Sequence, residues 1–189
     1  LRLTVKENLI SVYIDDVLML TYEDSDKVFS TGECGMRISE GDALFDNVRV
    51  YGTKLERDET VARIEPTKYT DDFEDEKEGE SPSHWQENYV ADRVIDNWKV
   101  YKKESLVYGN QNKTGYTATW LHVFDNNPEF SAKFLVESAG DDAQVGFITR
   151  RSPDTAYVNI GYDYKSKKWF VASQESEAAG EVTFWADST

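Results

Sequence analysis

The sequence predicts an all-β protein, a two-sheet antiparallel sandwich of the jelly-roll kind. Short runs rich in β-branched and aromatic residues follow one another and are separated by Gly, Asn, Asp, Ser and Pro. No stretch of comparable length carries an amphipathic helical stripe. A chain of 189 residues with about a dozen such runs favours two sheets stacked around one core.

The first two strands are expected to form a hairpin. Leu1, Leu3 and Val5 alternate with polar residues, and residues 9–14 follow after the turn-prone pair at 7–8. At most a turn or two of helix is expected within 54–64, because its apolar face is thin. The other strands are expected, in order, at residues 17–22, 34–38, 44–50, 98–101, 105–108, 115–124, 129–137, 144–150, 156–163, 168–173 and 181–185.

Residues 53–69 interrupt the strand pattern. They combine charge with few aromatic residues and one proline, Pro66, and they lead into the acidic run of residues 71–80. This composition predicts a connector followed by an exposed acidic loop. No motif on one side of the connector recurs on the other, so the chain is not two copies of one unit.

The charge of the chain limits its partners. There are 36 acidic residues against 21 basic ones, a formal net charge of −15, which disfavours binding to nucleic acid or to an anionic membrane surface. No apolar run is long enough to cross a bilayer, so we expect a soluble chain without membrane insertion. The chain opens inside a strand-like pattern, which indicates that it is processed or excised from something longer. The lone Cys34 excludes an internal disulfide and a thiolate metal cluster, and we expect it to be buried.

The first stretch, residues 1–51, resembles part of a known family. Its motifs are Val-Tyr-Ile-Asp-Asp at 12–16, Thr-Gly-Glu-Cys-Gly-Met at 31–36 and Phe-Asp-Asn-Val-Arg-Val at 45–50. In this order they resemble the C-terminal half of a laminin-G-like, concanavalin-type sandwich, a domain that commonly closes with a strand of the last form. Each motif is short, and it is the ordered set that carries the resemblance.

The second stretch, residues 70–189, is similar to the beginning of the same domain type. The similarity rests on Asp-Asp-Phe-Glu at 71–74, Trp85, Trp98-Lys99-Val100, Gly-Phe-Ile-Thr-Arg at 146–150 and Tyr-Val-Asn-Ile-Gly-Tyr at 157–162. The two halves therefore stand in reversed order.

Two explanations of this order remain open. The chain is either a piece of a tandem array cut in mid-domain, or one circularly permuted sandwich spanning residues 1–189. In the permuted sandwich, residues 1–52 are the C-terminal-type half, 53–69 the connector and 70–189 the N-terminal-type half. The combined length suits one sandwich, whereas two half-sandwiches would each expose a core face and unpaired edges, so the permuted domain is favoured. It requires the 44–50 strand to lie beside the strand that begins near Asp71.

The resemblance implies carbohydrate as the partner. Such sandwiches are similar to modules that accompany bacterial secreted glycoside hydrolases and polysaccharide lyases, and to fructan-binding modules beside levanases. The leading hypothesis is thus a non-catalytic carbohydrate-binding module, flanked by other domains in a larger polysaccharide-degrading protein. That protein is expected to be secreted or at the cell surface of a bacterium, and the module to raise the concentration of poly- or oligosaccharide near a catalytic domain.

Sugar recognition needs flat aromatic faces and polar groups for hydroxyls. The first choices are Trp169 and one of Arg150 and Arg151, because adjacent strand residues point to opposite faces. Each aromatic residue taken singly is more often a core residue. The full set of expected carbohydrate-binding residues is Trp169, Arg150, Arg151, Tyr162, Tyr164, Trp120, Tyr157 and Glu137, with Trp185 beside them.

Carboxylates near the two ends of the expected domain suggest a possible calcium site. In related concanavalin-type folds the first and last strands are neighbours, which would bring Asp46 close to Asp71 and Asp72. Calcium takes six to eight oxygen ligands. The alternative is that these residues form ordinary turns and a solvated loop.

Signals for catalysis are weak, and no catalytic residue is predicted. His84 and His122 lack metalloprotease spacing, and neither a nucleophile elbow nor a phosphate-binding loop is present. Two alternatives stay open: a sandwich-fold glycoside hydrolase or lyase, for which the keto-disaccharide hydrolase family has a similar sandwich, and a laminin-G-like adhesion domain.

Overall fold

The computed structural model describes residues 1–24, 32–54, 65–82, 84–87, 89–90, 93–94, 98–111, 115–125, 128–151, 157–174 and 181–185. This part of the chain is all-β, as predicted, and contains no helix. It therefore holds no helix able to span a membrane. The strands are β1 (Arg2–Lys6), β2 (Leu9–Ile14), β3 (Val17–Glu23), β4 (Gly32–Lys54), β5 (Glu65–Asp71), β6 (Trp85–Glu87), β7 (Tyr89–Val90), β8 (Arg93–Val94), β9 (Trp98–Lys102), β10 (Leu106–Asn110), β11 (Tyr116–Asp125), β12 (Glu129–Arg151), β13 (Tyr157–Asp163), β14 (Lys168–Gln174) and β15 (Glu181–Trp185).

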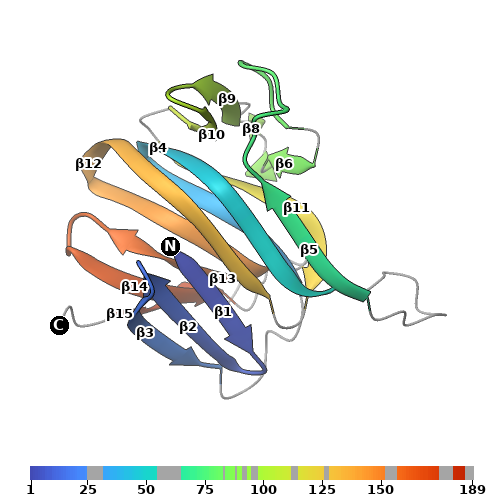
Figure 1. Ribbon diagram of the computed structural model, residues 1–189. Coiled ribbons are helices and arrows are strands. Elements are labelled where there is room, and N and C mark those ends of the chain that lie inside the picture. Colours follow the sequence, from blue (N-terminus) through green and yellow to red (C-terminus); the bar gives the residue numbers. More distant parts are fainter. Residues whose placement is uncertain are drawn as a thin grey trace.

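Two strands of 23 residues each, β4 and β12, run antiparallel to one another and organise the fold (Figure 1). The sequence predicted two separate strands in each of these regions. Instead each pair is joined through a corner, where Ala139 lies opposite Gly41 and pairing resumes with Gln144 opposite Ser39. Glu40 has a φ of 51° at this corner. The ladder continues because β4 and β12 turn together.

The corner divides each long strand into two arms. Residues 129–131 of β12 pair with β1, and β2 and β3 follow at that side of the sheet. Residues 144–149 pair with β13, and β14 and β15 follow. On its other side β4 pairs with β5, β10 and β11. Except for the small β7–β8 ladder, the described strands form one hydrogen-bonded network.

The arms of β12 face each other across the core. Phe130 from the first arm and Phe147 from the second stack with ring centroids 4.2 Å apart, and both are fully buried. The same core contains Leu3 and Ile10 from the first two strands and Ile160 from β13. The fold is thus β-sandwich-like, with side chains from residues 1–52 and from residues 70–189 in one apolar cluster.

The connector expected at 53–69 is wrong in its C-terminal part. Residues 65–71 form β5, which pairs with the end of β4 and places Val48 opposite Asp71. Seven residues of antiparallel pairing outweigh the unfavourable composition. Pro66 is tolerated there because β5 pairs only with β4, which leaves its other edge free of ladder bonds within the described network. Residues 55–64, for which a short helix was considered, lie outside the described residues.

The acidic run after β5 is mostly exposed, as predicted, but one of its residues is buried. Phe73 is fully buried and packs against Trp85 and Tyr108. Cys34, on β4, is also fully buried, as predicted, with its sulfur 3.6 Å from Oγ1 of Thr149.

Candidate functional site

Three of the predicted sugar-binding residues come together where β13 turns into β14. Tyr162 lies opposite Trp169 in the ladder, and their ring centroids are 5.3 Å apart. Tyr164 meets Tyr162 edge-on at 5.1 Å. All three side chains pack against the main core but remain partly exposed. We call Tyr162, Tyr164 and Trp169 the aromatic trio.

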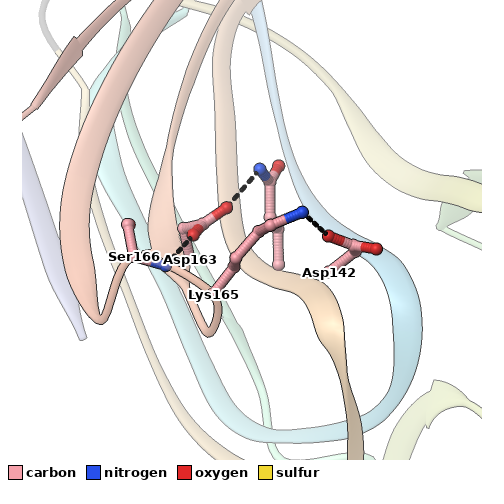
Figure 2. Close-up of polar contacts among 5 residues, drawn as sticks. Asp142, Asp163, Lys165 and Ser166 are labelled. Atoms are coloured by element: carbon pink, nitrogen blue, oxygen red, sulfur yellow. Dashed lines mark hydrogen bonds and ion pairs between the residues drawn. The ribbon is translucent and has the colours of Figure 1, made fainter.

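The turn that carries Tyr164 is held by polar contacts on both sides (Figure 2). Asp163 accepts a hydrogen bond from the backbone N–H of Ser166 at 2.7 Å and one from Nε2 of Gln144 at 2.8 Å. Lys165 and Asp142 form an ion pair of 2.6 Å. The contacts of Asp163 and Lys165 join the turn to β12. They hold the backbone that carries Tyr162 and Tyr164 in place.

The environment of Asp163 favours its charged form. Burial alone would raise its pKa, but the hydrogen bonds from Ser166 and Gln144 outweigh burial and lower the pKa below the ordinary aspartate value. The carboxylate form therefore stabilises the folded protein.

Asp163→Asn is expected to lower the free energy of unfolding by about 1–2 kcal/mol at pH 7. Because the folded-state pKa lies below the unfolded one, the wild-type contribution is complete above about pH 4 and is lost as the pH falls through the folded-state value. Urea unfolding at neutral pH and at about pH 3 measures this, and the gap between wild type and variant should narrow in acid. A gap that is the same at both pH values would contradict the assignment.

Trp120 and Tyr157 lie in a different place from the trio. With Ala118 and Ile148 they form a small apolar cluster separate from the main core. Trp120 is only 5% exposed, and Tyr157 is partly buried. The two residues are therefore together, but on the opposite face of the sheet from the trio, because side chains alternate along β13.

The same second face carries buried polar residues that sequence reasoning missed. Glu33 and Arg37 are 3% and 4% exposed, and Asn159 is fully buried. Arg37 donates to Oε1 of Gln144 at 2.8 Å, and its guanidinium lies 5.7 Å from the ring centroid of Phe170. The sequence signal was that Glu33 and Arg37 stand within a run of otherwise small or apolar residues, 33–38. In a strand that is covered on both faces, the side chains of both faces are buried, including such charged ones.

Glu137 belongs to neither group. It lies on the first arm of β12, is ion-paired with Lys103 at 2.6 Å and accepts a hydrogen bond from Gln111 at 2.7 Å. The hydrogen bond from Lys103 is the main cause that lowers its pKa. The side chains of Arg150, Arg151 and Trp185 lie outside the described part of the structure.

The carboxylates considered for calcium are used within the protein. Asp71 accepts hydrogen bonds from the hydroxyl of Tyr69 at 2.6 Å, the backbone N–H of Phe73 at 2.9 Å and Nε1 of Trp85 at 3.0 Å. Asp46 accepts a hydrogen bond from the backbone N–H of Asn47, and Asp72 accepts one from that of Glu74. In the described ranges no three His, Cys, Asp or Glu side chains are grouped to hold a metal ion. Calcium binding by Asp46, Asp71 and Asp72 stays a prediction, and the contacts of Asp71 show that its carboxylate also serves protein donors.

The phenol of Tyr69 belongs to this arrangement. Burial, and then the hydrogen bond to the Asp71 carboxylate, raise the pKa of Tyr69. The phenol therefore stays protonated and keeps donating to Asp71, which indicates a structural role for the carboxylate.

Comparison with known proteins adds no assignment. No protein-family model matches the chain, and no curated protein matches its sequence.

Proposed function

We propose that this chain is a non-catalytic carbohydrate-binding module of a larger secreted polysaccharide-degrading protein. The observation that carries the proposal is the aromatic trio, three rings that meet at one turn while remaining partly exposed. Aromatic faces of this kind stack on the C–H surface of a sugar ring. Fixed aromatic residues are suited to this role because little conformational entropy is lost when a ligand binds.

The polar groups around the turn suit sugar hydroxyls. Lys165 and Asp142 are 70% and 66% exposed, so each has donor or acceptor capacity beyond their ion pair. The second face offers a comparable mixture of aromatic and polar side chains, but Trp120 and its polar neighbours are almost fully buried. Exposure therefore favours the trio as the place where a sugar binds.

The finer fold assignment belongs to the same proposal. The bent arms of β4 and β12, with a core between them, are what a two-sheet jelly-roll sandwich of the laminin-G-like, concanavalin type requires. The strand beside the end of β4 is β5, which ends at Asp71, whereas the sequence suggested a strand that begins near it. A strand adjacent to β4 at this position still supports a permuted domain, because it joins the expected closing strand to the chain that follows.

Trp169→Ala is expected to weaken sugar binding about tenfold, because one stacking surface is lost. A glycan array identifies the bound neutral oligosaccharide, and calorimetric titration then compares the variants. Trp169→Phe should bind better than Trp169→Ala, since it keeps a ring. Tyr101→Ala, which removes a half-buried ring on β9, is the control and should leave affinity unchanged.

Melting curves accompany each titration, because Trp169 also packs against the core. A folded Trp169→Ala protein with wild-type affinity would remove the trio from the site. Turnover of the bound sugar by the isolated chain would favour the hydrolase or lyase alternative. Silence on the glycan array together with specific capture of a protein would favour an adhesion domain.

A further inference from the structure

A groove of about 410 Å³ that shares no lining residue with the aromatic trio lies on the face of β1, β2, β4 and β12 that points away from the core. Its lining residues on β4 are Asn47, Arg49 and Tyr51, which alternate with the core residues Val48 and Val50. The groove is thus a surface feature of the sheet and not a defect in its packing.

Strand register arranges the groove as a row. Tyr13 on β2 lies opposite Arg2 on β1, Arg2 opposite Ser131 on β12, and Ser131 opposite Arg49 on β4. The two arginines are therefore two strands apart, which corresponds to roughly 10 Å. A sugar unit spanning this distance would lie across the strands with a hydroxyl group, that of Ser131, beneath it.

The cations of the groove differ in their partners. Arg2 is ion-paired with Asp16 at 3.3 Å and lies 4.0 Å from the ring centroid of Tyr13. Arg49 is exposed and makes neither an ion pair nor a side-chain hydrogen bond with the residues that the structure describes, and the same is true of Lys133. Two cations of this groove therefore have no carboxylate partner among the described residues, although the whole chain has 36 acidic residues against 21 basic ones.

An aromatic ring lies beside the guanidinium of Arg49. Tyr51 follows Arg49 by two residues on the same face of β4 and is 36% exposed. Glu129 lies opposite Tyr51 across the ladder and Asp15 also lines the groove, so it excludes a densely charged polyanion while admitting a single acidic group near Arg49 and Lys133. A guanidinium presents a planar fork to a carboxylate or sulfate, and a tyrosine ring presents a flat face to a sugar.

We propose that this groove is a second binding site, which takes an acidic sugar unit of an oligosaccharide. Its carboxylate or sulfate binds the guanidinium of Arg49, and its ring stacks on Tyr51. Lys133 adds long-range attraction. The groove contains no residue of the aromatic trio, so binding of an acidic sugar at Arg49 does not require that Trp169 bind a neutral one.

Binding is measured by titration with a galactose tetramer that ends in one galacturonate, the same tetramer with that carboxyl group methyl-esterified, and a galactose tetramer that ends in one sulfated galactose. Arg49→Gln should weaken binding of the acidic tetramer about tenfold or more, because a charge-assisted hydrogen bond is lost. Lys102→Gln removes one exposed positive charge on β9, outside the groove, and is the control that should bind like wild type. Binding to wild type should also weaken with added salt.

The source of the anion follows from the probe that binds: the tetramer that ends in galacturonate identifies a carboxylate, and the sulfated tetramer identifies a sulfate. Equal affinity for the free and esterified tetramers, binding of neither acidic tetramer, or an unchanged affinity in Arg49→Gln would each overturn the proposal. Trp169→Ala, titrated in parallel, separates this result from the proposed function, because its effect falls on the neutral oligosaccharide alone.

Discussion

Phe147→Ala is expected to lower the free energy of unfolding by about 3–5 kcal/mol, because it removes a fully buried ring and leaves a cavity. Phe147 stacks on Phe130, so its loss affects both arms of β12. Urea unfolding followed by tryptophan fluorescence measures the change. Leu135→Ala, on the same strand but with 59% of its side chain exposed, is the control and should change stability by less than about 0.5 kcal/mol.

A double-mutant cycle shows whether the two arms pack together in solution. Phe130→Ala and Phe147→Ala should be coupled by about 0.5–1.5 kcal/mol if the rings stack. Strictly additive effects would mean that the arms do not face each other, and the folded-over arrangement of β12 would then be wrong.

Asp71→Ala is expected to lower the free energy of unfolding by about 2–3 kcal/mol, because the hydroxyl of Tyr69 and Nε1 of Trp85 lose their common acceptor. Asp71→Asn keeps one carbonyl oxygen in place and should lose less. Thermal or urea unfolding at neutral pH measures both variants. A loss below about 0.5 kcal/mol for Asp71→Ala would show that the hydrogen bonds contribute little.

The same variants separate a structural carboxylate from a calcium ligand. If Asp71 acts only through its protein donors, its replacement has the same effect in calcium and in chelator. A melting temperature that rises with calcium in wild type, through binding to the folded state, and that no longer rises in Asp71→Ala would establish the metal site that the sequence suggested.

The strands were largely predictable because their signal is local. Alternation of apolar and polar residues identifies β1 and β2, and turn-forming residues mark the ends of β13 and β14. The neighbourhood of Tyr162, Tyr164 and Trp169 was also within reach of the sequence, since a short turn between two strands brings its flanks together. β5 was missed because a charged, proline-containing segment has little strand character of its own and gains its order from pairing with β4.

The sequence treated the aromatic residues of 120–169 as one set, and the structure separates them. Tyr157 and Tyr162 lie on the same strand but on opposite faces, since they are an odd number of positions, five, apart along β13. The arginine of the groove is a similar case. Arg49 is one charged residue among many in the sequence, and only register across three strands places it in a row with Ser131 and Arg2.

By itself the sequence determined the all-β class, the position of most strands and the burial of residues such as Cys34, because hydrophobic alternation and turn chemistry depend on neighbouring residues. The tertiary structure alone decided that β4 and β12 bend together, that Asp71 is held by Tyr69 and Trp85, and which face each aromatic ring occupies. These features depend on register and on contacts between residues far apart in the chain. A shift of one residue in register moves every side chain to the other face of the sheet, and only the packing of the complete core selects among registers.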